Sequence, residues 1–313
     1  MRISDSTFTD NFLSQIQQLQ QQQNTLQGES SSGLSVTLPE DNPPVMAQVL
    51  NLQTDSAANA AYQSNITQLQ DTATTSATAM NSLQTLVSQV NEIATEASNG
   101  TNSSSQLSDY ATQVEALIQQ AVQLGNTQDA DGNYIFSGTA TNTRPFVATT
   151  DADGNITSVA YKGNSDVAGS EIAPNTTVSA QVPGANTSGS GAEGLFTDSR
   201  TGADLFSHMI ALQQDLTSGN TSAISSTDAP ALNKDEDNIV GQISANGVMQ
   251  SALTAAGNIA TARSTNLTTQ ISGDTSADLA QTLTELSQTQ TAYEAALESG
   301  TKVLQISLVD FLA

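Results

Sequence analysis

The stretch from Val45 to Ser98 carries an apolar or small residue at every third or fourth position over most of its length. Alternating steps of four and three are typical of a helix that packs along another helix for many turns. At 1.5 Å per residue this helix would be ~80 Å long, which exceeds what a globular domain requires. The sequence therefore predicts a rod of long helices, with a first seam made of Tyr62, Ile66, Leu69, Ala73, Ser76, Met80, Leu83, Val87, Val90, Ala94 and Ala97.

The same stepping resumes after Asn99-Gly100 and a Ser-rich loop, and it ends at Gly125. Residues 45–138 are therefore predicted to form a long antiparallel helical hairpin. Helical spacing returns from Ala203 to Leu216 and more weakly beyond Lys234, so residues 204–274 are predicted to lead the chain back along the rod. The second seam comprises Leu107, Tyr110, Val114, Leu117, Ala121 and Leu124, and the returning seam includes Ile239, Ile243 and Leu253.

Amphipathic helices are predicted at both ends of the chain, within residues 1–44 and 275–313. The first is expected to end at a Gly- and Ser-bearing break from Gly28 to Gly33, followed by a turn at Pro39–Pro44. Each helix is too polar to be stable alone, so it needs a partner, either the other terminal helix or a neighbouring subunit. We expect partner and assembly contacts from Phe8, Phe12, Ile16, Leu19, Leu283, Leu286, Tyr293, Leu297, Leu304, Leu308 and Phe311.

Residues 139–203 differ in character from both flanking regions, because they are rich in turn formers and β-branched residues. Short strands are predicted around Val159 and Tyr161, and around Val178, Ala180 and Val182, each behind a tight turn. Pro183 to Gly194 is predicted to be loop. The expected fold is mainly α with a β-rich middle domain.

The charge balance excludes several classes of partner. Seven Lys and Arg residues face 31 Asp and Glu residues, for a formal net charge of −24. Such a chain repels nucleic acid and anionic membrane surfaces. It has no cysteine, so it forms no disulfide, and its first residues lack the apolar run of a secretory signal peptide.

Few residues could carry out catalysis. His208 is the only histidine, so a multi-His metal site cannot be built within one chain, and we predict that it lies on a helix flank rather than in a Ser-His-Asp triad. Asp151–Asn155 differs from a calcium loop, which needs Gly sixth and Glu twelfth, and we interpret it as a hairpin turn. Glu92 and Glu96 are interpreted as solvated charges on a helix. We predict no catalytic, cofactor-binding or metal-binding residue and therefore no enzyme activity.

Two alternatives use the middle segment differently. A secreted enzyme would need a His, a Cys or paired carboxylates between Gly138 and Ala203, yet that stretch has no His and no Cys. An acidic, adhesin-like binding module would also use this segment. A binding assay on the segment would distinguish it from a purely structural part.

Motifs at both ends and after the second helix resemble the flagellin-like family, and within it the hook-filament junction proteins. The opening Met1-Arg2-Ile3-Ser4 and the turn from Ser32 to Pro43 are similar to the family start, although Leu34 and Ser35 stand where the family has basic residues. The run Asp131–Gly138 resembles the junction proteins more than flagellin proper. The residues that match family motifs are Gly33, Pro39, Asp41, Pro43, Asp131, Gly132, Tyr134, Phe136, Gly138 and Arg263.

The resemblance implies a structural adaptor between the flagellar hook and the filament, or alternatively a flagellin or minor flagellin-like protein. It also implies export through the flagellar type III channel without a cleaved signal peptide and an extracellular place in the flagellum. The implied partners are hook-associated protein 1, flagellin, further copies of the chain in a ring and a cytoplasmic export chaperone. The terminal helices would form the inner tube core, the long helices the surrounding rod, and residues 139–203 an outer domain.

Overall fold

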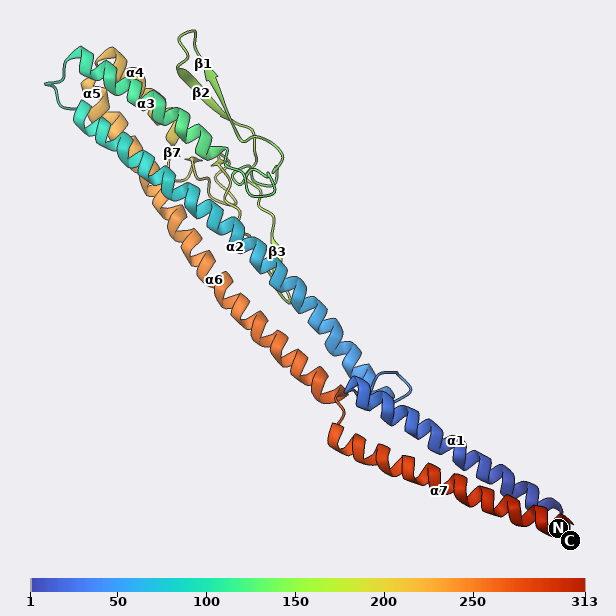
Figure 1. Ribbon diagram of the computed structural model, residues 1–313. Helices are drawn as coiled ribbons and strands as arrows, with labels where there is room; N and C mark the ends of the chain where they lie inside the picture. Colours follow the sequence, from blue (N-terminus) through green and yellow to red (C-terminus); the bar gives the residue numbers. More distant parts are fainter. Residues whose placement is uncertain (1, 313) are drawn as a thin grey trace. The chain divides into compact units, whose positions relative to one another are not determined.

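The computed structural model describes the backbone of residues 2–312 and the side chains of residues 10–302. The chain divides into two compact units, one made of residues 1–58 and 263–313 and the other of residues 59–262. Long helices make up most of both units, and all the strands lie in the second (Figure 1). The prediction of a mainly α fold with a β-containing middle region is confirmed.

In the first unit, the terminal helices α1 (Arg2–Ser32) and α7 (Leu279–Leu312) pack side by side (Figure 1). The break predicted from Gly28 to Gly33 is wrong for most of its length, because α1 continues to Ser32. The hydroxyls of Ser31 and Ser32 each donate to the carbonyl of Gly28 at 2.9 Å, which accommodates the serines in the last turn. Gly33 follows the last helical residue, and its φ of 73° lies in the left-handed region that favours glycine.

A polar turn connects α1 to α2 (Pro43–Ala97), as predicted. The Asp41 carboxylate accepts the backbone N–H groups of Leu38 at 2.7 Å and Thr37 at 2.9 Å. These bonds lower the pKa of Asp41 below its ordinary value. Pro43 begins α2 at a position where no helical hydrogen bond is required of its nitrogen.

The second unit is built around the rest of α2, with α3 (Ser104–Gly125), α4 (Leu205–Ser218) and the part of α6 (Ala229–Thr275) up to residue 262. The seam predicted for α2 is confirmed from Ile66 to Ala97, where every member is buried, whereas its first member, Tyr62, is only half-buried. The antiparallel helix expected after the Ser-rich loop is α3. It begins with a capping box in which Ser103 and Gln106 satisfy each other's backbone N–H groups.

The predicted seam of α3 needs a correction. Leu107, Val114 and Ala121 are buried as expected, but Tyr110, Leu117 and Leu124 are only half-buried. Because α3 also packs against α4, it buries a second stripe that the single-seam prediction missed. That stripe contains Ala111, Ile118 and Val122.

Aromatic side chains from distant parts of the chain form the centre of the second unit. The ring of Phe146 lies 4.7 Å from Phe196, 5.1 Å from Phe206 and 5.2 Å from Tyr161, measured between ring centroids. Phe136 packs edge-on against Phe196 at 5.8 Å. This cluster attaches the strand-bearing segment to α4 and contains four of the chain's seven phenylalanines.

Three small sheets lie in the second unit. The first pairs β1 (Phe146–Thr150) with β2 (Ile156–Tyr161), and the second pairs β3 (Ser170–Ala173) with β4 (Thr176–Val178), both antiparallel. The third has the order β5 (Ala185–Asn186), β6 (Thr197–Asp198), β7 (Ala203–Asp204). A short α5 (Thr221–Ala223) and a π-helical turn η1 (Ile224–Asp228) join α4 to α6.

The predicted strands are partly right. Val159 and Tyr161 lie in β2 and Val178 ends β4, but Ala180 and Val182 lie outside any strand. Ala185–Asn186 forms β5 within the segment predicted as loop. Ala180 is buried with Leu69 and Leu253 from helices, so packing rather than a strand partner explains its apolar character.

Candidate functional site

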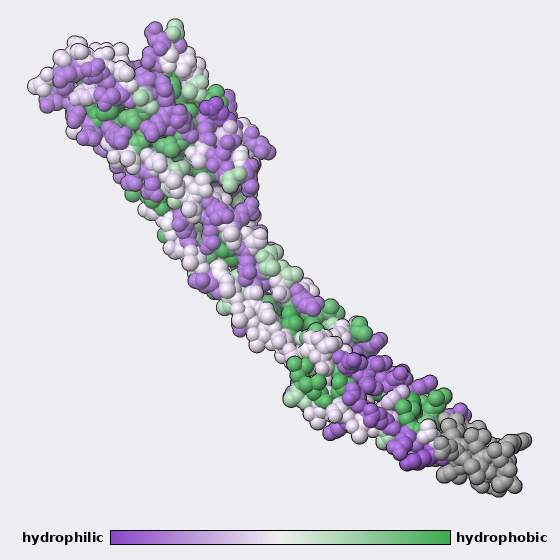
Figure 2. Space-filling view, in the orientation of Figure 1, coloured by the Kyte–Doolittle hydropathy of each residue, from purple (hydrophilic) through white to green (hydrophobic). Residues whose placement is uncertain are grey.

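The terminal helix pair leaves much of its apolar surface open. On α7, Thr282 and Thr289 are buried, whereas Leu283 is 53% exposed and Leu297 is 42% exposed. Leu279 is also exposed, at 47%. Both threonines thus lie on the covered face of α7, with half-buried Leu286 and Tyr293, whereas a stripe of leucines stays exposed, and Figure 2 shows hydrophobic residues at the surface of this unit.

The assembly residues predicted on α1 form its heptad stripe. Ile16 is buried, and Phe12 and Leu19 are half-buried. The ring of Phe12 lies so close to Gly300 of α7 that a methyl group there would overlap it. Leu13, beside this stripe, is 55% exposed.

The remaining predicted assembly residues divide into two groups. Leu286 and Tyr293 are half-buried on α7. The side chains of Phe8, Leu304, Leu308 and Phe311 lie outside the part of the chain whose side chains are described.

The residues matching family motifs lie at turns and at the aromatic core. Phe136 is fully buried, and its carbonyl accepts the N–H of Gly184 at 2.7 Å and the hydroxyl of Tyr161 at 3.0 Å. Gly138 has a φ of 67°, and a Cβ there would collide with the backbone carbonyl of Asn164. The segment Tyr134–Gly138 therefore anchors the strand-bearing segment to the end of α3.

The other motif residues are more exposed. Pro39 and Asp41 lie in the turn before α2, and Asp131 and Gly132 lie in the turn that follows α3. Arg263 makes an ion pair with Asp55 at 3.5 Å, with about half of each side chain exposed, so it adds little stability.

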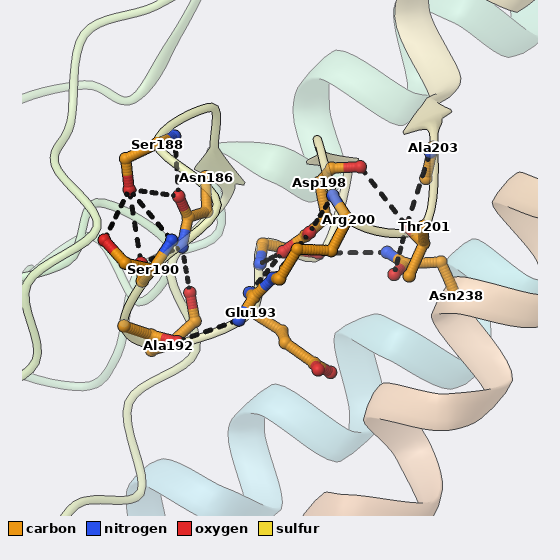
Figure 3. A network of polar contacts seen from close by, with 12 residues as sticks. Asn186, Ser188, Ser190, Ala192, Glu193, Asp198, Arg200, Thr201, Ala203 and Asn238 are labelled. Atoms are coloured by element: carbon orange, nitrogen blue, oxygen red, sulfur yellow. Dashed lines mark hydrogen bonds and ion pairs between the residues drawn. The ribbon is translucent and has the colours of Figure 1, made fainter.

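A buried polar cluster, which the sequence analysis missed, connects the loop before α4 to α6 (Figure 3). The Asp198 side chain is fully buried, and it receives two hydrogen bonds from the Arg200 guanidinium, at 3.0 Å from Nε and 2.6 Å from Nη2. The N–H groups of Gly194 and Arg200 donate to the same carboxylate at 2.9 and 2.8 Å. We call Asp198, Arg200 and Asn238 the loop clamp.

Asn238 supplies the α6 side of the loop clamp. Its amide nitrogen donates to the carbonyls of Gly194 and Leu195, both at 2.9 Å, and its amide oxygen accepts the hydroxyl of Thr201 at 3.1 Å (Figure 3). The helix thereby satisfies loop carbonyls that would otherwise be buried without a partner.

The surroundings of Asp198 determine whether its carboxyl group is ionised. Burial on its own would raise the pKa of Asp198, but the hydrogen bonds from Arg200 and from the Gly194 N–H outweigh it and lower the pKa to about 2. The carboxylate is therefore ionised at neutral pH. A tight, charge-satisfied pair of this kind holds a loop in place and presents no reactive group.

His208 lies in a second polar cluster. Its Nδ1 is 2.8 Å from Oδ2 of buried Asp235, whose other oxygen accepts the N–H of Asp204 at 2.8 Å. The hydrogen bond to Asp235 raises the pKa of His208. Burial raises the pKa of Asp235 in turn. His208 thus connects the start of α4 to α6, which fits the predicted place on a helix flank.

Over the described residues, no three His, Cys, Asp or Glu side chains come together as ligands for a metal ion. Within that same part of the chain, none of the helices combines the length and the hydropathy that crossing a bilayer requires.

The chain is similar in sequence to a known protein family and to a known protein. Residues 3–141 match the family model of the bacterial flagellin N-terminal helical region. A stretch of 121 residues is 29% identical to "Flagellar hook-associated protein 3" of Escherichia coli (strain K12) and spans 37% of this chain and 37% of that relative.

Solved structures share the fold. A putative flagellar hook-associated protein from Vibrio parahaemolyticus matches with a TM-score of 0.63 at 22% identity, covering 76% of this chain and 100% of that one. FlgL from Bacillus cereus matches with a TM-score of 0.56 at 15% identity, covering 71% and 99%. FlgL from Xanthomonas campestris gives 0.54 at 17% identity, covering 71% and 99%. The resemblance drawn from the sequence motifs is confirmed.

Proposed function

We propose that this chain, which carries a bacterial flagellin N-terminal helical region and has the fold of the FlgL proteins, is a structural adaptor that joins the flagellar hook to the flagellin filament. The curated relative named flagellar hook-associated protein 3 supports this role. So does a fold made mostly of long helices. An adaptor needs surfaces that bind other subunits and needs no catalytic residue.

The observation that carries the proposal is the leucine stripe left open on α7. Leu279, Leu283 and Leu297 are between 42% and 53% exposed although α7 is already paired with α1. Burying each leucine against another subunit would contribute roughly 1.5–3 kcal/mol before the entropy of ordering is subtracted. Assembly would thus convert an exposed stripe into a buried core.

The arrangement in the flagellum follows from this role. Residues 1–44 and 275–313 would form the inner tube core, residues 45–138 and 204–274 the rod around it, and residues 139–203 the outer domain. The subunits would form a ring, with hook-associated protein 1 on one side and flagellin on the other. A cytoplasmic chaperone would hold the chain before export through the flagellar type III channel to the cell exterior.

The second candidate function is that of a flagellin or a minor flagellin-like subunit. The match to the flagellin N-terminal region is compatible with it. The curated relative and the segment from Asp131 to Gly138 favour the junction role instead.

Electron microscopy of flagella from a strain lacking the gene, together with an assay of flagellin in the medium, tests the proposal. We expect bare hooks and secreted monomeric flagellin, both reversed by the wild-type gene. Filaments of normal length would contradict the junction role and favour a minor flagellin.

The role of the leucine stripe is tested by L283S/L297S in the complemented strain. We expect the variant to be exported and helical but unable to support filament growth, because the side chains that would be buried on assembly are now polar. V167S serves as the control, since Val167 is also a large exposed residue, at 37%, and lies in the other unit. Equal filament growth by L283S/L297S and V167S would contradict this use of the stripe.

A further inference from the structure

Cationic side chains are scarce on this protein, and few of them are free. Among the six basic side chains that the structure describes, Arg200, Arg263 and Lys302 form ion pairs with Asp198, Asp55 and Glu298. The other three, which make no ion pair with any described residue, are Arg144, Lys162 and Lys234.

Arg144 and Lys162 lie next to each other. The N–H of Lys162 donates to the carbonyl of Pro145 at 2.7 Å, one residue from Arg144. Both side chains are exposed at the base of the β1–β2 hairpin. Val147 on the same hairpin is 41% exposed and is paired with exposed Ala160. We call this surface, defined by Arg144, Lys162, Val147 and Ala160, the hairpin patch.

An acidic groove of about 420 Å³ lies between α2 and α3 of the same unit. Glu92 and Glu96 supply its charge, and Ile93 and Leu117 supply apolar walls. The hydroxyl of Tyr110 donates to Glu96 at 3.0 Å and fixes that carboxylate at the surface. No basic side chain lines the groove, whose other lining residues are Gln89, Gln113, Ala116 and Gln120.

We propose that the α2–α3 groove binds the hairpin patch of a second copy of this chain. The two surfaces have opposite charge, and each combines that charge with apolar side chains. Two copies that each carry a net charge of −24 repel one another, and a contact that places unpaired cations against carboxylates offsets part of that repulsion locally. The hairpin patch holds two of the three.

The contact joins different surfaces of the two copies, so it is a head-to-tail interface. Interfaces of this kind generate closed rings when the rotation between copies closes. The inference rests on the proposed function for its ring of subunits and identifies which surfaces would meet. Charge pairing of this kind chiefly fixes partner choice and orientation, while the apolar side chains contribute the burial.

Cross-linking of the full chain in solution tests the contact directly, because the wild-type sequence has no cysteine. One preparation carries Q113C in the groove and a second, differently tagged, carries A160C in the hairpin patch. A short bismaleimide linker should join the two preparations, and about 1 M NaCl, where the Debye length is ~3 Å, should reduce the yield at least tenfold. Q113C mixed with S244C, which lies on exposed α6 surface, is the control.

Charge reversal adds a second measurement. A compensating pair of variants that restores cross-linking shows that the first variant had not simply misfolded. E92K/E96K on the Q113C chain should abolish cross-linking to A160C, and mixing it with an A160C chain carrying R144E/K162E should restore the yield. Yields no higher than the control, or yields unaffected by charge reversal, would overturn the proposal. Such a failure leaves the gene-deletion test untouched, so the groove contact and the junction role are judged separately.

Discussion

Asp228 is a buried acid in the π-helical turn between α4 and α6, with only 3% of its surface exposed. Its Oδ2 has no hydrogen-bond partner among the described residues. Burial, followed by repulsion from Asp215, raises the pKa of Asp228 from 3.8 to about 6, although the positive charge of His208 opposes the rise. Replacing Asp228 by Asn keeps the shape and removes the ionisation.

The size and sign of the effect follow from this pKa. The shift of about two pH units corresponds to ~3 kcal/mol. Between about pH 4 and pH 6 the folded chain holds a proton that the unfolded chain has released, so wild-type stability falls as the pH rises. Above pH 6 the full cost of an ionised, buried Asp228 is present. We expect D228N to be more stable than wild type by up to ~3 kcal/mol at pH 7 and by little at pH 4.

Denaturant unfolding followed by circular dichroism at a series of pH values from 4 to 7 measures this difference. D237N is the control, because Asp237 is an exposed acid on α6. The midpoint difference between D228N and wild type should grow with pH, while that of D237N should stay nearly constant. A stability gain that is absent, or equal at pH 4 and pH 7, would show that Asp228 carries no such ionisation cost.

Three further predictions concern stability and can be measured by the same unfolding assay. D198N should cost roughly 2–4 kcal/mol at pH 7, because it leaves Arg200 without its buried partner, and the loss should shrink towards pH 2, where the wild type also loses this contribution. G138A should destabilise by more than the ~1 kcal/mol expected for G132A, since both glycines have positive φ but only Gly138 has a carbonyl in the way. E115L should cost about 1–3 kcal/mol for each buried amide that loses its acceptor, whereas E115Q should cost less; equal losses would contradict this account.

The long helix α2 could be predicted from sequence because its seam is apolar for many turns. From Ile66 to Ala97 the spacing alone identified residues that are all buried, but the predicted start at Val45 was two residues late, because α2 begins at Pro43. Periodicity of this strength leaves only one face that can be buried. The turn before α2 was equally predictable, because Pro39 and Asp41 are residue types that favour turns.

The helix α6 was predicted only weakly, and its contacts explain why. Its buried stripe includes Asn238, Gln242 and Asn246, so hydropathy does not reveal the period. These amides are buried because they meet polar groups elsewhere in the fold, as when Gln242 donates to Glu193 at 3.1 Å. The loop clamp was missed for the same reason, since nothing in the run from Asp198 to Arg200 shows which helix will cover it.

A repeated pentapeptide was a signal that sequence reasoning could have used. Asp-Ala-Asp-Gly-Asn occurs at residues 129–133 and again at 151–155. In each copy the first Asp accepts the N–H groups of the third and fifth residues at 2.9–3.0 Å, and the Gly has positive φ. The same five residues therefore form the same turn twice, once after α3 and once between β1 and β2.

The terminal helices mark the limit of what periodicity can predict. The leucines of α7 predicted a helix with a partner, and either α1 or a neighbouring subunit could have been that partner. In the structure α7 packs against α1 and its buried residues include Thr282 and Thr289, whereas Leu283 and Leu297, two heptads apart, stay exposed. The spacing of the leucines thus predicts which face of α7 a partner must cover. Because threonines can lie in the contact with α1, the exposed leucines remain available to a different partner. The pairing with α1 therefore does not use up the surface that assembly requires.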